Sequence, residues 1–177
     1  MQRIACLLIG IIAACGGGTE SGPGMLTGVM PQPKSVGART FAGADGNGTN
    51  VLGWKLEFFE QGPGADCLSS DTKVLARIGI YTNQPDDGVK EHALLAIGDI
   101  PIVVASPPPV NGAAAATMSA EGANGIQGIV TITEFHLSDA SHGDRIKGTV
   151  TAGGMDGAGG GVSITGTFDA PYCPEED

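Results

Sequence analysis

The sequence predicts an all-β protein, most simply an antiparallel β-sandwich of about eight to ten strands with a C-terminal meander. Apolar and polar residues alternate one by one along several short runs, and Gly, Pro, Asn and Asp separate these runs. No segment has apolar residues at the spacing of an amphipathic helix. Two packed sheets would bury many one-sided strands, and a small β-barrel is the alternative.

The clearest alternation lies in the first half of the chain. From Leu52 to Phe58, apolar residues occupy one face of the predicted strand, while Lys55 and Glu57 occupy the other. Trp54 falls on the apolar face, so it is predicted to be a core residue. The next predicted strand alternates in the same way. Its inward face holds Val74, Ala76, Ile78 and Ile80, and its outward face holds Lys73, Arg77 and Tyr81.

Less regular segments are predicted to complete this half of the sheet. Short strands are expected at Leu26–Met30 and Gly37–Phe41. Asn83–Gly88 predicts a turn, and Ala93–Val104 predicts one bent strand or two short ones. Ala113–Ala116 has the propensity for a helical turn, but the flanking Gly112 and Gly122 favour a short strand that reaches Met118 and Ala120.

The last third of the chain contains a weak internal repeat. Ile126, Ile146 and Ile164 are each followed two residues later by Gly, at intervals of 20 and 18 residues. Each unit is expected to form one strand and one turn, which gives an antiparallel meander with a Thr-rich face toward solvent. The recurring Gly is compatible with a bulge, a close backbone approach, or room for a facing aromatic ring such as Trp54.

Composition excludes one large class of partner. The 177-residue chain fits one domain and has a formal net charge of -10. Negative charge repels phosphate backbones, and the sequence has no Lys/Arg cluster or RNA-binding aromatic motif to offset it. A nucleic-acid partner is not expected.

The first residues have the layout of an export signal. Arg3 precedes an apolar run from Ile4 to Ala14, which is too short to span a bilayer. The sequence Ile12-Ala13-Ala14-Cys15 resembles the lipobox of bacterial lipoproteins. This resemblance implies a signal peptide over residues 1–14 and lipidation of Cys15 with a diacylglyceryl group and an acyl chain such as palmitate. Several acyl chains would anchor the protein stably to a membrane without spanning it.

The resemblance also implies a domain layout and a location. Residues 15–25 hold the lipidated Cys and a flexible Gly-rich tether, and residues 26–177 form a single β domain. Gly16 stands where an Asp would favour inner-membrane retention, so family behaviour implies the bacterial outer membrane. The whole layout resembles small bacterial lipoproteins with a β domain, which implies an architecture and no particular activity.

Two cysteines remain for the exported domain. Cys6 would leave with the signal peptide and Cys15 would be acylated, which leaves Cys67 and Cys173. Because the exported compartment favours oxidation, we expect a disulfide between them, closing a loop of about 100 residues. A redox or metal-binding thiol pair is the alternative, but neither a C-x-x-C spacing nor clustered His accompanies either Cys.

The sequence offers weak metal candidates. Asp45, Asn47, Thr49 and Asn50 place oxygens at positions that a calcium loop would use, but Leu56 stands where a bidentate Glu is needed. A turn in which Asn and Gly supply positive φ is the simpler interpretation, and no other cofactor is expected. A second cluster of possible metal ligands consists of His136, Asp139, His142 and Asp144. The spacing of these residues fits no named metal site.

Function is less determined than architecture. The sequence contains no Gly-x-Ser-x-Gly, His-Glu-x-x-His or P-loop motif, so an enzyme is not expected. We predict a non-enzymatic binding, adhesion or structural module at the cell envelope, with a protein or glycan partner. The alternatives are a carbohydrate- or calcium-binding module and an envelope enzyme with a dispersed site. Candidate aromatic residues for sugar contact are Phe59, Tyr81 and Tyr172.

Overall fold

The computed structural model describes residues 25–61, 73–89, 92–137 and 144–173. These ranges form strands and turns without an α-helix, which confirms the all-β prediction. None of the described residues belongs to a helix that could cross a membrane. The strands are β1 (Met25–Thr27), β2 (Ser35–Ala44), β3 (Asn50–Phe59), β4 (Val74–Pro85), β5 (Gly98–Ile102), β6 (Ala115–Ala120), β7 (Asn124–His136), β8 (Arg145–Met155) and β9 (Gly161–Pro171).

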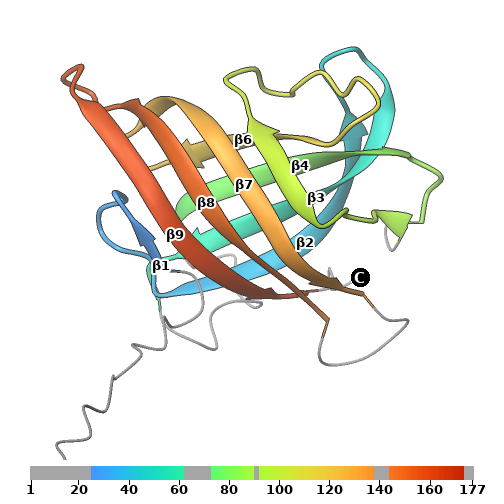
Figure 1. The fold of residues 1–177 in the computed structure, drawn as a ribbon, viewed down its shortest axis with the longest axis horizontal. Helices are drawn as coiled ribbons and strands as arrows, with labels where there is room; N and C mark the ends of the chain where they lie inside the picture. Colours follow the sequence, from blue (N-terminus) through green and yellow to red (C-terminus); the bar gives the residue numbers. More distant parts are fainter. Residues whose placement is uncertain (1–24, 62–72, 90–91, 138–143, 174–177) are drawn as a thin grey trace, which may run out of the picture.

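The nine strands form one mixed sheet in the order β1-β9-β8-β7-β5-β6-β4-β3-β2. All neighbours are antiparallel except β5 and β6. The sheet curls into a half-barrel in which β7, β8 and β9 face β2, β3 and β4 (Figure 1). Just beyond β9, Tyr172 pairs with Ala38 of β2, and the Cys173 N–H donates to the Ala38 carbonyl at 2.8 Å. The apolar faces are buried inside one curled sheet, which is closer to the barrel alternative than to two separate sheets.

Aromatic rings fill the interior from both sides. Trp54 of β3 is 1% exposed and makes edge-to-face contacts with Phe135 of β7 and Tyr172, each at a centroid distance of 5.5 Å. Phe58 meets Phe168 of β9 at 6.3 Å. Trp54 is therefore a core residue, as predicted. These contacts join strands on opposite sides of the half-barrel and fix its curvature.

The segment before β5 departs from the prediction of strand over Ala93–Val104. Only Gly98–Ile102 forms a strand, whereas Ala93 and Leu95 are buried outside the sheet. The Trp54 indole N–H donates to the Ala93 carbonyl. The apolar side chains of this segment pack against the core. Its backbone therefore forms no strand pairing with a neighbouring strand.

The predicted turn at Asn83–Gly88 also begins later than expected. β4 continues to Pro85, which pairs with Val51 of β3. The chain then turns at Gly88, where φ is 83°.

The first strand is shorter than predicted. β1, at one edge of the sheet, covers Met25–Thr27, whereas the prediction was Leu26–Met30.

The C-terminal meander is confirmed, because β7, β8 and β9 are consecutive antiparallel strands. Thr131, Thr149 and Thr167 lie side by side on its outer face. A Cβ added to Gly148 would lie 2.6 Å from Cζ of Phe168. The same Cβ would lie 2.2 Å from the Thr131 carbonyl oxygen, so Gly148 allows both a close backbone approach and a facing aromatic ring, which is Phe168 rather than Trp54. At Gly128 of the same repeat, a Cβ would lie 2.2 Å from the Thr151 carbonyl oxygen, which is a close backbone approach.

Candidate functional site

The outer face of β2, β3, β4 and β6 carries three adjacent cross-strand rows of residues. Side chains alternate between the two faces of a strand, so the residues between the buried core positions all point outward. The first row is Phe41, Gly53, Tyr81 and Ala115; the second is Arg39, Lys55, Gly79 and Thr117; the third is Gly37, Glu57, Arg77 and Ser119. The first row therefore holds the two aromatic residues, and the four charged residues lie in the second and third rows.

Glu57 contacts the three cationic side chains on this face. Its side chain is 11% exposed, and its Oε1 accepts hydrogen bonds from Nε and a terminal nitrogen of Arg77 at 2.9 and 2.7 Å. Nζ of Lys55 lies 3.8 Å from Oε1, and Nε of Arg39 lies 4.0 Å from Oε2. Among the described residues, one carboxylate thus faces three cations, so the described part of this cluster has a net positive charge, whereas the chain has a formal net charge of -10.

An aromatic pair lies beside the cations. Phe41 and Tyr81 meet edge to face at a centroid distance of 5.1 Å across Gly53. A Cβ on Gly53 would lie 2.5 Å from Cζ of Phe41, so only Gly allows the two rings to approach. Burial raises the pKa of Tyr81 above its ordinary value of 10.0. Its hydroxyl is protonated at neutral pH, as that of an ordinary tyrosine would be.

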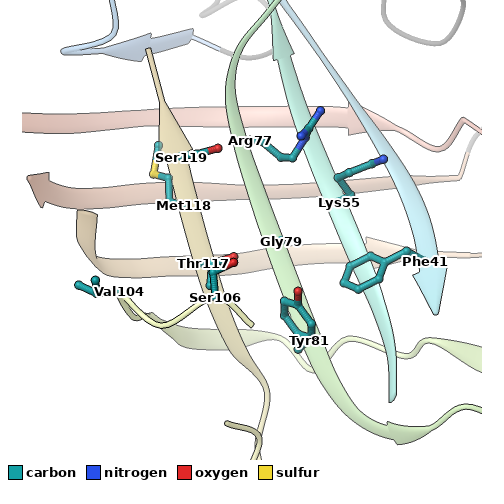
Figure 2. Close-up of a pocket in the computed structure, with 10 residues that line it drawn as sticks. All are labelled: Phe41, Lys55, Arg77, Gly79, Tyr81, Val104, Ser106, Thr117, Met118 and Ser119. Carbon is teal, nitrogen blue, oxygen red and sulfur yellow. The ribbon is translucent and has the colours of Figure 1, made fainter. Parts of the chain in front are cut away.

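These rows form a groove with a volume of about 490 Å³, which we call the outer groove. Gly79 forms part of its floor, with the aromatic pair on one side and Lys55 and Arg77 on the other (Figure 2). The volume lies within the usual range for small-molecule sites. The groove is lined by Phe41, Lys55, Arg77, Gly79, Tyr81, Val104, Ser106, Thr117, Met118 and Ser119.

The turn between β2 and β3 holds the loop that carries Val104 and Ser106 of the groove. Asp45 Oδ2 accepts the backbone N–H of Val110 at 3.1 Å, and the Gly46 N–H donates to the Pro108 carbonyl at 2.9 Å. A Cβ on Gly46 would lie 2.9 Å from the Pro107 carbonyl oxygen, so the two segments pack backbone to backbone. The rim of the outer groove therefore depends on contacts outside the groove itself.

The four calcium candidates lie in this same turn. Asp45 is buried, and its Oδ1 accepts the backbone N–H groups of Asn47 and Thr49 at 2.9 and 2.8 Å. Burial alone would raise the pKa of Asp45, but the N–H donors of Thr49, Val110 and Asn47 outweigh it and lower the pKa below 3.8. The carboxylate faces hydrogen-bond donors, while Asn50 begins β3 and pairs with Ala44. This geometry favours the structural turn over a cation loop.

The other predicted positions are only partly described. Cys15, Cys67, Asp139 and His142 lie outside the described residues. Cys173 is buried beside Ala38 at the end of the sheet, and its pairing with Cys67 stays a prediction. The described ranges hold no group of three or more His, Cys, Asp or Glu arranged to bind a metal ion.

Of the three predicted sugar-contact residues, one lines the outer groove, together with an aromatic residue that was not predicted. Phe59 is buried, and Tyr172 is half-buried with its ring packed against Trp54. Tyr81 lies on the outer face, as predicted, and lines the outer groove. Phe41, which was not among the predicted residues, lies beside it. The sequence feature that could have indicated Phe41 is Gly53, which alternation places on the outer face. Once the strand register is known, Gly53 leaves space for the rings of Phe41 and Tyr81.

Comparison with known proteins places the chain in no described family. No protein-family model, no curated protein and no solved structure matches it.

Proposed function

We propose that the protein is a non-enzymatic binding module of the bacterial cell envelope that takes a small ligand in the outer groove. One observation carries this proposal: cations, an aromatic pair and hydroxyl groups line one groove of about 490 Å³. Small-molecule sites typically combine an apolar wall with a few placed polar groups. The carboxylate in the cluster, Glu57, is engaged by Arg77, which supports a binding role over proton transfer.

The location of this module is part of the proposal. The sequence Ile12-Ala13-Ala14-Cys15 supports cleavage before Cys15 and lipidation of its thiol, with the Gly-rich segment as a tether from the outer membrane. The Cys67–Cys173 disulfide would stabilise the tethered domain by joining distant parts of the chain.

Intact mass spectrometry of the protein purified from bacterial membranes tests the location. We expect loss of residues 1–14, an added lipid mass, and the mass deficit of one disulfide that disappears on reduction. An uncleaved chain without added lipid would contradict the anchor.

A thermal-shift screen of metabolites and envelope glycan fragments tests the groove. A ligand that binds only the native state raises the melting temperature. We expect at least one ligand to stabilise the wild type and the Lys147→Gln variant but not a Tyr81→Ala/Arg77→Gln variant. Lys147 is a suitable control, because its side chain is 32% exposed and lies on β8, outside the groove. Ligands that stabilise all three proteins equally would contradict the groove as the site.

A further inference from the structure

The charges in the outer groove are incompletely neutralised. The Lys55 side chain is 35% exposed and makes an ion-pair contact at 3.8 Å, and its ammonium group donates no hydrogen bond to any described residue. Arg77 is 49% exposed and directs two of its nitrogens to the same Glu57 oxygen. Both side chains therefore retain donors for an anionic group, and charge-assisted hydrogen bonds are the strongest that such groups make.

The rest of the groove suits a hydroxyl-rich ring rather than a bare anion. The hydroxyl of Tyr81 points toward the floor at Gly79 (Figure 2). Thr117, Ser119 and Ser106 add further hydroxyls to the lining. The Phe41–Tyr81 pair offers apolar ring surface, against which the C–H face of a sugar ring packs favourably.

We infer that the outer groove binds an acidic saccharide, with its carboxylate or sulfate at Lys55 and Arg77 and its sugar ring beside the Phe41–Tyr81 pair. This inference rests on the proposed function and names the ligand class for the same groove. It also explains why a strongly acidic chain gathers cations here: the positive cluster attracts an anion that the rest of the molecule repels.

Titration calorimetry with chemically matched probes tests the inference. Digalacturonic acid and its neutral dimethyl ester compare a carboxylate with an uncharged group on the same sugar, and lactose 6′-sulfate and lactose provide the same comparison for sulfate on a sugar without a carboxylate. We expect at least one acid to bind, its neutral counterpart to bind at least tenfold more weakly, and added NaCl to weaken binding of the acid. Comparing the two acids shows which acidic group the groove takes.

Two variants locate the site. Lys55→Gln removes one cation and should weaken binding of the acid about tenfold, the size expected when a charge-assisted hydrogen bond is lost. Ser119→Glu breaks no ion pair, because Ser119 is uncharged, and the exposed position leaves space for the larger side chain. The new carboxylate should repel the same acid from the groove. Lys147→Gln on β8 is the matched control and should bind like the wild type. Melting temperatures of all variants establish that each is folded.

Four results would overturn the inference. Equal binding of acid and neutral forms would show that charge has no role, and inorganic sulfate or acetate binding as tightly as the saccharide would show that the ring has none. If neither acid binds while the thermal-shift screen finds another groove ligand, the ligand class is wrong and the proposed function stands. Equal weakening by Lys55→Gln and Lys147→Gln would remove the site from the groove.

Discussion

Asp45 and Val110 are 65 residues apart in the sequence, and the Val110 N–H donates to Asp45 Oδ2 at 3.1 Å. This hydrogen bond ties the β2–β3 turn to the loop between β5 and β6. Because Val104 and Ser106 of that loop line the outer groove, the shape of the groove depends on a carboxylate that does not touch it.

Asp45→Ala should loosen the loop and lower the melting temperature. The change removes the acceptor for three backbone N–H groups, those of Asn47, Thr49 and Val110. Hydrogen exchange of the Val110 amide should become faster, because its partner is lost.

The second hairpin provides a matched control for this experiment. Asp156 in the β8–β9 turn accepts the backbone N–H groups of Ala158 and Gly160 at 2.9 and 2.6 Å, as Asp45 does for its own turn. Asp156→Ala should weaken its hairpin and leave exchange at Val110 unchanged. Faster exchange at Val110 in both variants would show that the effect is global rather than local.

The same contact should depend on pH. The folded pKa of Asp45 is lowered, so its contribution to stability is complete above the unfolded value of 3.8 and is lost as the pH falls through the folded pKa. The amide chemical shift of Val110 should therefore titrate below pH 3.8. Asp45→Asn should abolish this titration, and a wild-type midpoint above 3.8 would contradict the assignment.

Gly148→Ala should destabilise the protein by about 1–3 kcal/mol, the usual cost of overpacking. The new Cβ would lie 2.2 Å from the Thr131 carbonyl oxygen and 2.6 Å from the Phe168 ring. Chemical denaturation measures the change. Gly157→Ala is the control, because a Cβ there meets nothing within 4 Å, and equal losses in the two variants would contradict the packing at Phe168.

Glu57→Gln should lower the free energy of unfolding by about 1–2 kcal/mol, because it removes a charged acceptor from Arg77 and leaves the three cations facing one another. High salt should reduce this loss by screening the repulsion. Glu134→Gln, which breaks the more exposed pair with Lys147, should have a smaller effect. A salt-independent loss would indicate that packing, not charge, explains the change.

Much of the strand pattern could be predicted from the sequence, because one-by-one alternation reports which face of a strand is buried. Trp54 inside, and Lys55, Arg77 and Tyr81 outside, follow from alternation alone. Alternation does not determine whether apolar faces meet across two sheets or within one curled sheet. That outcome depends on long-range pairing such as Ala38 with Tyr172.

Predicting the outer groove would also have required knowledge of which strands pair and in which register. Phe41 and Tyr81 face each other only because both lie opposite Gly53 in the register of β2, β3 and β4. The sequence placed oxygens at Asp45, Asn47 and Thr49 but could not show that the Asp45 carboxylate would accept backbone donors from its own turn and from Val110. Strand register and turn hydrogen bonds, not residue type, define the groove and its rim.

Chemical-shift mapping with the digalacturonic acid probe tests the central claim, that the outer groove is the binding site. The amides of Lys55, Gly79 and Tyr81 should shift as the probe is added, and those of Thr149 and Thr167 on the far outer face should not. Shifts confined to the β7–β9 face, or absent from the groove while the probe binds elsewhere, would contradict the claim.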